Sequence, residues 1–318
     1  MDNFLVILGA MLIDIALGWP NVLFKLVGHP VTWLSKIINL LDVNLNNPSY
    51  SDNAKRFNGC IALLICIVLI SIIFMTIQKI LADVPFGIFI TMILTWPLIA
   101  INSMHKHIKD ILEDFKKNKI QLIRKSVSKV VGRNTLNLNK TNLVRASIES
   151  LGENTSDGII APIFWGLIFG LPGIALYKTI NTLDSMIGYK NNKYKDFGWA
   201  SARVDDFVNL IPSRITGVFY ALISKNFLFT ITVMIKDGNK HVSPNAGYPE
   251  AALAGALNVS LSGPRVYNKV TRNDPWLNEK GLPPSVLDLK KALKLYENII
   301  KLIVFLVILF LIIKSSIL

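Results

Sequence analysis

Long apolar stretches alternate with basic polar segments along this chain. Three stretches are strongest: one begins at Ile61, one begins at Phe86, and one runs from Ile299 to Ile313. Each approaches the roughly 20 apolar residues that a helix needs to cross a bilayer. The run from Phe4 to Leu17 has the length of a signal-peptide core, but it lacks a basic start and a small-residue cleavage site, and it contains Asp14. We therefore expect it to remain as a helix of the protein.

Two weaker apolar stretches are interrupted by prolines and glycines. The first, Ile159 to Tyr177, carries Pro162 and Pro172, and the second, Phe207 to Ile235, carries Pro212. Irregular backbone at membrane depth is tolerated only where it is buried in protein or lines a cavity. These stretches therefore predict broken or re-entrant helices.

The pattern as a whole predicts an all-α fold, namely a polytopic integral membrane helical bundle. Composition supports this class, because 52% of the residues are hydrophobic and only 17% are charged. We expect residues 1–318 to form a single membrane domain with hydrophilic loops at about 105–147, 178–204 and 236–298, of which the first and third are cytoplasmic. The number of helices depends on whether the two interrupted stretches cross the bilayer or re-enter it.

The formal net charge of +13 is distributed as a membrane topology requires. Lysines and arginines concentrate between the apolar stretches, as in cytoplasmic loops, and no nucleic-acid motif accompanies them. We therefore expect a multi-pass cell-membrane protein that does not bind nucleic acid, with the short turn around Asp83 outside. The basic segment from Lys178 to Arg203 conflicts with simple alternation of the spans, and re-entrant helices on either side would resolve the conflict.

A first polar cluster, from Ser147 to Gly158, stands directly before an apolar stretch. Glu149 and Glu153 are four apart, so a helix would present both carboxylates on one face, and Asn154 adds a neutral oxygen. Thr155, Ser156 and Asp157 are typical of a cap for the next helix. The unpaired N–H groups at the start of that helix would favour an anionic ligand. An ordinary capped helix end explains the same residues equally well.

A second cluster supplies carboxylates, guanidiniums and amides around a hairpin-like unit. Its members are Asn181, Asp184, Arg203, Asp205, Asp206, Asn209 and Arg214. Carboxylates suit Mg²⁺, and Arg suits bidentate binding of carboxylate or phosphate. Charge near the ends of apolar helices is costly, which favours a functional role for the three aspartates. For Asp196 and the Lys190 to Lys195 run we expect salt bridges within the loop itself.

The third cluster is the motif "HVSPNAGYPEAALAGAL", followed by "SGPR". Pro249 is placed for a first helical turn, Glu250 favours the positive end of that helix, and the alanines that follow form a small face for close packing. Ser243 and Asn245 lie in the preceding turn, and Arg265 ends the unit with a guanidinium. A packed connector and a ligand loop are equally consistent with this pattern.

The segments "SLGENTSDGIIAPIFW", "NTLDSMIGY", "ARVDDFVNLIPSRITG" and "HVSPNAGYPEAALAGAL", in that order, resemble the CobD or CbiB family of cobalamin-biosynthesis membrane proteins. The early segments "DIALGWP" and "GHPVTWL" resemble the N-terminal pattern of that family, so the resemblance covers nearly the whole chain. After "SGPRVY" the chain has Asn268 and Lys269 where the family pattern has a nearby glycine.

The resemblance implies an adenosylcobinamide-phosphate synthase, a ligase that joins a carboxylate of adenosylcobyric acid to aminopropanol or its O-phosphate. A carboxylate must be activated before an amine attacks it, most simply by ATP with Mg²⁺, and this requires carboxylates and cationic groups. We predict Glu149, Glu153, Asp157, Asp184, Asp205 and Asp206 as catalytic residues, with Glu153, Asp157 and Asp205 holding Mg²⁺. We predict Asn154, Asn181, Arg203, Arg214, Ser243, Asn245, Glu250 and Arg265 as substrate-binding residues. The active site is expected on the cytoplasmic side.

Two other functions use similar residues. A membrane transporter for a corrinoid or a cation would also place acids near broken helices, and vectorial uptake without covalent change would identify it. The paired aspartates superficially resemble those of intramembrane prenyltransferases, but their spacing is wrong. The form of the amine and the oligomeric state stay open.

Overall fold

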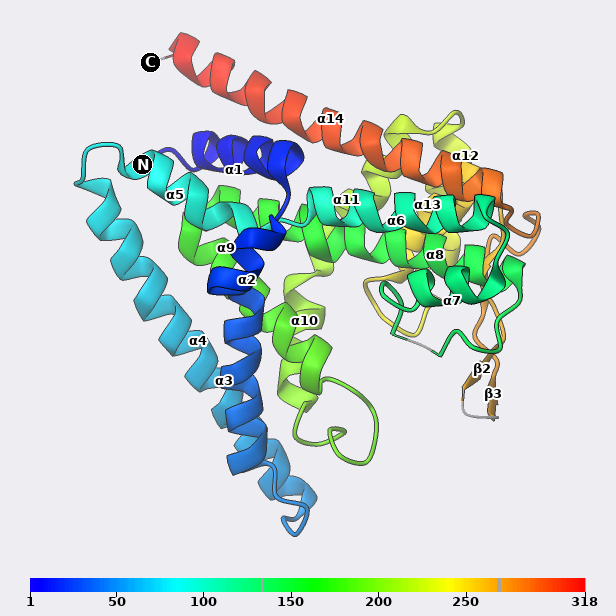
Figure 1. The fold of residues 1–318 in the computed structure, drawn as a ribbon, viewed down its shortest axis with the longest axis horizontal. Helices are drawn as coiled ribbons and strands as arrows, with labels where there is room; N and C mark the ends of the chain where they lie inside the picture. Colours follow the sequence, from blue (N-terminus) through cyan, green and yellow to red (C-terminus); the bar gives the residue numbers. More distant parts are fainter. Residues whose placement is uncertain (133, 268–269, 318) are drawn as a thin grey trace. The chain divides into compact units, whose positions relative to one another are not determined.

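A computed structural model describes residues 1–132, 134–267 and 270–317, with the backbone alone at 265–267 and 270–272 (Figure 1). The helices are α1 (Asn3–Leu17), α2 (Asn21–Val27), α3 (Pro30–Leu45), α4 (Asp52–Ala82), α5 (Gly87–Thr95), α6 (Ile101–Lys116), α7 (Ile120–Val127), α8 (Lys140–Thr155), α9 (Ala161–Ile187), α10 (Trp199–Val208), α11 (Leu210–Ile223), α12 (Phe227–Gly238), α13 (Gly247–Leu257) and α14 (Val286–Ile317). Short strands form two antiparallel pairs, β1 (Leu261–Ser262) with β4 (Trp276–Leu277) and β2 (Arg265–Tyr267) with β3 (Val270–Arg272). The predicted all-α class is confirmed.

The chain divides into two compact units, and each is interleaved in sequence. Unit 1 comprises Met1–Ala100, Ala161–Asn209 and Val307–Leu318, and unit 2 comprises Ile101–Ile160 and Leu210–Leu306. The hydrophilic segment at 105–147 is itself largely helical, because it contains most of α6, all of α7 and the start of α8.

Several helices are long and apolar enough to cross a membrane. In the described part of the chain there are four such spans, or five if the bent pair formed by α1 and the segment Asn21–Leu45 is counted as one. The four are Asp52–Ala82, Gly87–Lys116, Lys140–Ile187 and Val286–Ile317. Helix α4 shows the physical reason: Leu64, Ile72 and Met75 each expose 61% of their surface. A helix that is apolar on all sides has no stable place in water, so these side chains face lipid. The predicted polytopic membrane bundle is confirmed.

The first interrupted stretch is a broken helix, as predicted. Within α9, Gly170 has φ +67° and Pro172 follows it. A Cβ added to Gly173 would lie 2.3 Å from the carbonyl oxygen of Trp165, whereas a straight helix would separate these two residues by about 12 Å. The helix axis therefore bends sharply at Gly170.

Two side chains from other helices of unit 1 satisfy the backbone at this break. The amide nitrogen of Asn3 donates to the carbonyl oxygen of Leu167 at 3.3 Å. The amide oxygen of Gln78 accepts from the backbone N–H of Leu171 at 2.9 Å. A broken helix in hydrocarbon requires such partners, because an unpaired backbone group there costs several kcal/mol.

The second interrupted stretch forms a helical hairpin in unit 2. Helix α11 has 14 residues and α12 has 12, and the turn between them is capped by Asn226, whose side-chain oxygen accepts from the N–H of Phe229. Each helix is shorter than the roughly 20 residues that a complete crossing needs. Pro212 lies in the first turn of α11, where its missing N–H has no helical partner to lose.

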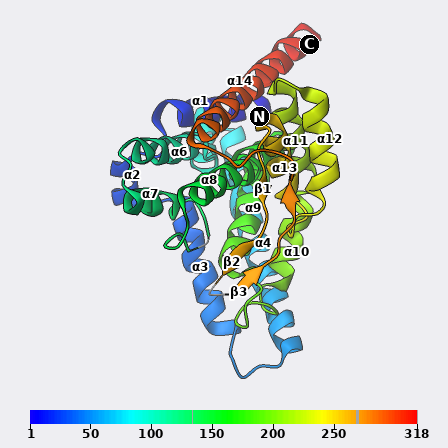
Figure 2. The ribbon, with the colours of Figure 1, turned by 90° about the vertical axis from the view of Figure 1, so that its right-hand side faces the viewer.

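Helices α12 and α13 lie side by side (Figure 2), and close packing of small residues holds them together. Ala251, Ala252 and Ala254 are fully buried on α13. A Cβ on Gly255 would lie 3.1 Å from the Cα of Thr230 and from the Cβ of Val233, so the two helix backbones approach closely. The predicted small-residue face is confirmed.

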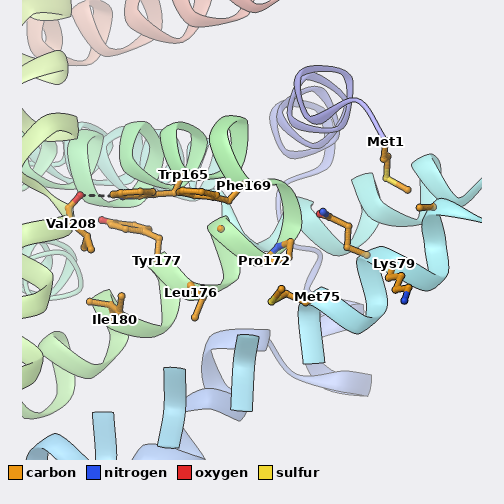
Figure 3. Close-up of a pocket in the computed structure, with 13 residues that line it drawn as sticks. Met1, Met75, Lys79, Trp165, Phe169, Pro172, Leu176, Tyr177, Ile180 and Val208 are labelled. Atoms are coloured by element: carbon orange, nitrogen blue, oxygen red, sulfur yellow. Dashed lines mark hydrogen bonds between the residues drawn. The ribbon is translucent and has the colours of Figure 1, made fainter. Parts of the chain in front are cut away.

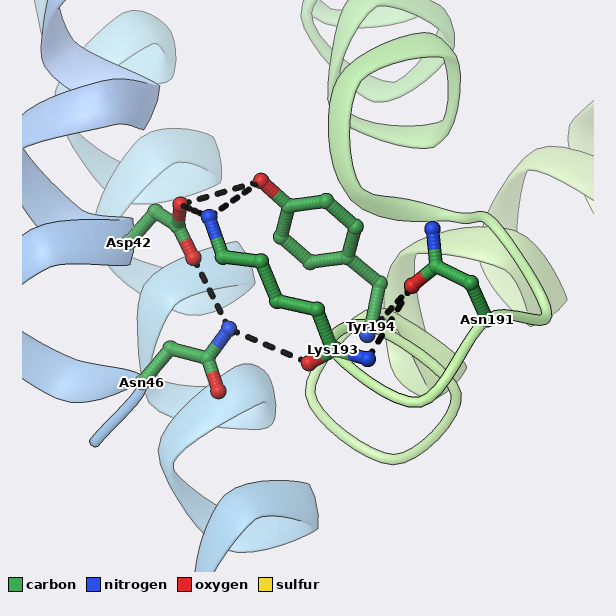
Figure 4. A network of polar contacts seen from close by, with 5 residues as sticks. All are labelled: Asp42, Asn46, Asn191, Lys193 and Tyr194. Carbon is green, nitrogen blue, oxygen red and sulfur yellow. Dashed lines mark hydrogen bonds and ion pairs between the residues drawn. The ribbon is translucent and has the colours of Figure 1, made fainter. Parts of the chain in front are cut away.

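The loop between α9 and α10 is fixed to the end of α3 (Figure 4) and also to α4, both in unit 1. The Lys193 ammonium lies 2.7 Å from a carboxylate oxygen of Asp42, and the Tyr194 hydroxyl donates to the same oxygen. The side-chain amide of Asn46 donates to the Lys193 carbonyl oxygen and to Asp42. The expectation of pairing within the loop is only partly correct, because Asp196 also pairs with Arg56 of α4 at 2.9 Å.

Candidate functional site

The acidic segment of α8 continues into a π-helical turn, Ser156–Ile160, and then directly into α9. The hydroxyl of Thr155 donates backward to the carbonyl oxygen of Leu151 at 2.6 Å, as a hydroxyl inside a helix does. The predicted cap ending at Asp157 is therefore wrong, since the helix does not stop there. Single π turns inside α-helices recur at functional sites.

Glu149 is buried and is bonded to a backbone group. Its carboxylate, in a side chain that is only 5% exposed, accepts the N–H of Ser262 at 2.7 Å. Ser262 has φ +59°, so this bond holds a left-handed backbone position at β1. Three residues further along α8, Gly152 faces Glu250 of α13, and a Cβ on Gly152 would be 3.5 Å from the Glu250 backbone.

Glu250 is buried near the start of α13, beside the imidazole of His241. The distance from His241 Nε2 to Glu250 Oε2 is 3.9 Å. The remaining predicted residues of α8 and the π turn are less buried: Glu153 is exposed and Asp157 is half-buried. Asn154 is also half-buried, and its amide donates to the main-chain and side-chain oxygens of Ser150, so its N–H groups serve its own helix.

The loop before α13 holds a guanidinium in a fixed place. The hydroxyl of Ser243 accepts the N–H groups of Asn245 and Ala246, which closes the turn. The side-chain oxygen of Asn245 accepts from Arg214 at 2.9 Å, and the guanidinium lies 3.9 Å over the ring of Tyr248. Ser243 therefore shapes the turn and Asn245 holds Arg214, while their predicted substrate binding stays a prediction.

Unit 1 contains the second set of predicted residues, arranged between the later half of α9 and α10. Asn181 donates to one carboxylate oxygen of Asp205 at 3.4 Å, and Asn209 donates to the other at 3.0 Å. The hydroxyl of Tyr177 donates to the side-chain oxygen of Asn209 at 2.9 Å. Tyr177 and Asn181 are four apart, as are Asp205 and Asn209, so two helix faces meet through matching polar pairs.

Asp184 and Asp206 flank this arrangement. No described residue donates a hydrogen bond to the half-buried Asp184 carboxylate, which is close enough to Asp205 for their charges to repel. The Arg203 guanidinium lies 4.0 Å from Asp206 on the same helix. The three carboxylates therefore lie in one region, where the charges of Arg203 and Lys190 act on Asp206.

This environment changes the acidity of the α10 carboxylates. Burial, together with the neighbouring Asp184 charge, raises the pKa of Asp205 to about 7. Burial also raises the pKa of Asp206, although Arg203 opposes that change. A carboxyl with a pKa near neutrality can exchange a proton at physiological pH, which suits acid–base chemistry.

The predicted residues thus fall into two sets, and each set is assembled within its own unit. Unit 1 brings together Asn181, Asp184, Arg203, Asp205 and Asp206, and unit 2 holds Glu149, Glu153, Asn154, Asp157, Arg214, Ser243, Asn245 and Glu250. The backbone of Arg265 belongs to β2, but its side chain lies outside what the structure describes.

Sequence reasoning missed three residues that complete these sets. Tyr177 lies four residues before Asn181, and this spacing could have shown from the sequence that the two side chains share one face of a helix. Arg145 lies four residues before Glu149, stacks 4.7 Å over the ring of Trp276 and donates to Asn142. His241 gave no signal, because its partner Glu250 is nine positions away and only the fold brings them together.

Unit 2 also contains a polar cavity of about 710 Å³ beside α12 and α13. Four lysines line it, namely Lys225, Lys236, Lys240 and Lys280, together with Asp237 and Glu279. Asp237 is engaged on both oxygens, by Lys240 at 2.6 Å and by the N–H of Asn278 at 2.9 Å. The net charge of the lining is positive, which suits an anionic ligand.

The oxygen donors of unit 1 fit a hard cation such as Mg²⁺ in kind. In the described ranges, no group of three His, Cys, Asp or Glu residues is arranged to hold a metal ion by itself. Mg²⁺ commonly uses only one or two carboxylates and completes its shell with water and substrate phosphates. Fewer than three carboxylates therefore suffice for Mg²⁺ where water and a phosphate complete the shell.

A family model described as CobD/Cbib protein matches residues 7–296 of the chain. The chain belongs to the CobD/Cbib family. A cobalamin biosynthesis protein CobD from Rhodobacter capsulatus is 46% identical over 286 residues, covering 90% of each chain. Proteins of the same name are 38% identical in Sinorhizobium sp, over 88% of this chain and 89% of the relative, and in Brucella suis biovar 1, over 97% of each. No solved structure matches the chain.

The CobD/Cbib match covers all three polar clusters, so both units belong to the part that defines the family. The resemblance inferred from the four sequence motifs is confirmed.

Proposed function

We propose that this protein is a membrane-bound ligase of cobalamin biosynthesis, which joins a side-chain carboxylate of adenosylcobyric acid to aminopropanol or its O-phosphate. The observation that carries the proposal is the group of three carboxylates with Asn181 and Asn209 in a CobD/Cbib chain whose named relatives are cobalamin biosynthesis proteins. Neighbouring carboxylates with a raised pKa are typical of a site that moves protons beside a bound cation.

The reaction needs two steps. In the first, the corrinoid carboxylate attacks the terminal phosphorus of ATP, ADP leaves, and an acyl phosphate forms. In the second, the amine attacks the acyl carbon, the C–O bond to phosphate breaks, and inorganic phosphate leaves as the amide forms. The attacking nitrogen loses one proton, and we assign Asp205 as its acceptor, because a pKa of about 7 allows the carboxylate to take that proton at neutral pH.

Bound Mg²⁺ would supply charge neutralisation on the phosphate oxygens. Asp184 and Asp206 would hold it together with water and the substrate phosphate, and the assignment of Mg²⁺ to Glu153, Asp157 and Asp205 stays a prediction from the sequence. Arg203, in the same unit as these carboxylates, would bind phosphate, and Arg214 and Arg265 of unit 2 stay predicted anion-binding residues.

The predicted residues of unit 2 would contact the corrinoid. Its periphery carries amide and carboxylate groups, which pair with carboxylates and amides such as Glu153, Asp157 and Asn154 through hydrogen bonds. Glu149 and Glu250 are buried, and we assign them to holding β1 and His241 in place. We expect the protein in the cell membrane with this site facing the cytoplasm.

A mass-spectrometric assay tests the proposal directly. Membranes that contain the protein are given adenosylcobyric acid, aminopropanol phosphate and Mg-ATP, with each component omitted in turn and with free aminopropanol as the second amine. We expect a product heavier than the corrinoid by the amine minus water, formed only with ATP. Glu153→Gln and Asp205→Asn should each abolish the product while membrane insertion stays normal, and full activity in either variant removes that residue from the mechanism.

Unchanged corrinoid with correctly inserted protein would instead favour the transporter. The observation behind this second candidate is the acid cluster next to a broken helix. Sealed vesicles that accumulate labelled corrinoid without a change in mass would establish it.

A further inference from the structure

Unit 1 contains an apolar cavity of about 590 Å³ that the proposed reaction does not use (Figure 3). The late part of α4 and both halves of the broken α9 form most of its wall, which includes Met75, Phe169, Pro172, Leu176 and Ile180. Its volume lies within the range of about 300–1,000 Å³ that is usual for ligand pockets. Figure 3 shows Lys79 and Met1 at one end of the wall and Val208 and Ile180 at the other.

The break in α9 creates this cavity. The bend at Gly170 brings Trp165 and Phe169 over the turn that holds Pro172 and Gly173. The rings of Trp165 and Phe169 stack at 5.9 Å and form a flat apolar wall. Both α4 and α9 belong to segments apolar enough to cross a membrane, so hydrocarbon chains are the surrounding solvent.

Lys79 supplies a cation at the polar end of the cavity. Lys79 lies in the last turn of α4, is exposed, and forms no ion pair with any described residue. A lysine near the end of a membrane helix reaches the level of the lipid headgroups. Positive charge above an apolar slot is complementary to an anionic headgroup that carries hydrocarbon chains.

The far end of the same wall is bonded to the carboxylate cluster of unit 1. The indole N–H of Trp165 donates to the carbonyl oxygen of Val208 at 3.1 Å. Tyr177, which also lines the cavity, donates to Asn209, and Asn209 donates to Asp205. An occupant that fixes the Trp165 and Tyr177 rings therefore also fixes the residues that orient Asp205.

We propose that this cavity binds one anionic phospholipid, with an acyl chain against Trp165, Phe169 and Leu176 and with the phosphate beside Lys79. This inference concerns a lipid site and does not depend on the proposed ligase reaction.

Native mass spectrometry of the full-length purified protein tests the site. Phosphatidylglycerol and phosphatidylcholine with identical acyl chains are titrated against wild type and three variants. In wild type we expect phosphatidylglycerol to bind about fivefold more tightly, because one lysine near a lipid headgroup contributes about that factor. Lys79→Gln should remove this preference, and Leu176→Trp should weaken both lipids by filling the cavity.

Lys55→Gln is the matched control, because Lys55 lies on the same helix, at its opposite end, and likewise forms no ion pair with a described residue. It should keep the wild-type preference. A preference that survives Lys79→Gln would overturn the proposal, as would equal binding of both lipids by wild type. A dimer of the protein that disappears with Leu176→Trp would also overturn it, because a second copy of the chain would then occupy the cavity.

Fluorescence provides a second readout if Leu176→Trp does not fold. Phosphatidylglycerol with brominated acyl chains should quench a component of the tryptophan emission that is missing in Trp165→Phe. Equal quenching in wild type and Trp165→Phe would place the lipid elsewhere.

Discussion

Replacing Gln78 by leucine should open the break in α9. The Gln78 side chain gives the Leu171 N–H its acceptor, at 2.9 Å, at the point where Gly170 interrupts the helical hydrogen bonds. Leucine has a similar size but no acceptor, so the N–H of a fully buried residue loses its partner. An unsatisfied buried donor costs about 1–3 kcal/mol.

Hydrogen–deuterium exchange measures this cost locally. If the Leu171 amide exchanges through local opening, a loss of 1–3 kcal/mol accelerates its exchange by roughly 5-fold to 150-fold. Peptides that cover residues 166–177 should therefore exchange faster in Gln78→Leu in detergent, while peptides from α12 and α13 in unit 2 should not change.

Gln78→Glu is the matched control, because a carboxylate oxygen can still accept the N–H of Leu171. It should exchange close to the wild-type rate in the same peptides. If Gln78→Leu left the exchange around Leu171 unchanged, the side chain would not be the partner that stabilises the broken helix, and the account of the break would be wrong.

Three further predictions concern stability. Asp205→Asn should raise the melting temperature more at pH 8 than at pH 5, measured in detergent with EDTA. The pKa of Asp205 in the folded protein, about 7, lies above the usual value of an aspartate, so wild type loses stability as the pH rises through 7. An equal effect at both pH values would contradict this reasoning. Gly59→Ala should destabilise by about 1–3 kcal/mol, because its Cβ would lie 1.9 Å from the Phe197 carbonyl oxygen, while Gly132→Ala, with open space around it, should be neutral in the same thermal scan. Glu149→Ala should cost about 1–3 kcal/mol by leaving the N–H at β1 unpaired, and Glu149→Gln should restore most of it; equal losses in both would show that charge matters more than the hydrogen bond.

The membrane helices could be predicted because their signal is local. The runs at Ile61 and Phe86 and the C-terminal run are continuous in sequence, and each lies in an apolar span, although the run at Phe86 is divided between α5, a short 3-10 turn and the start of α6. The break in the first interrupted stretch was also predictable, since Gly170 and Pro172 disturb helical bonding whatever surrounds them. Its partners were not, because Asn3 and Gln78 are far away in sequence.

The error at Thr155 has a clear physical origin. Thr, Ser and Asp before an apolar run are typical of a helix start, and the same hydroxyl can instead donate to a carbonyl one turn earlier. Thr155 does so, and it also pairs with the buried Tyr220 hydroxyl at 2.9 Å. A tertiary partner therefore decided between two conformations that the local sequence leaves nearly equal.

The carboxylate cluster shows how a broken membrane helix can serve chemistry. The later half of α9 places Tyr177, Asn181 and Asp184 along one face, because they are four and three residues apart. Tyr177 bonds Asn209 while Asn181 bonds Asp205, so the order of partners runs in opposite directions on the two helices and fixes an antiparallel register. A slip by one helical turn would break both bonds at once. Asp205 is thereby immobilised, whereas Asp184 accepts no hydrogen bond from the described residues and keeps its oxygens available to a ligand.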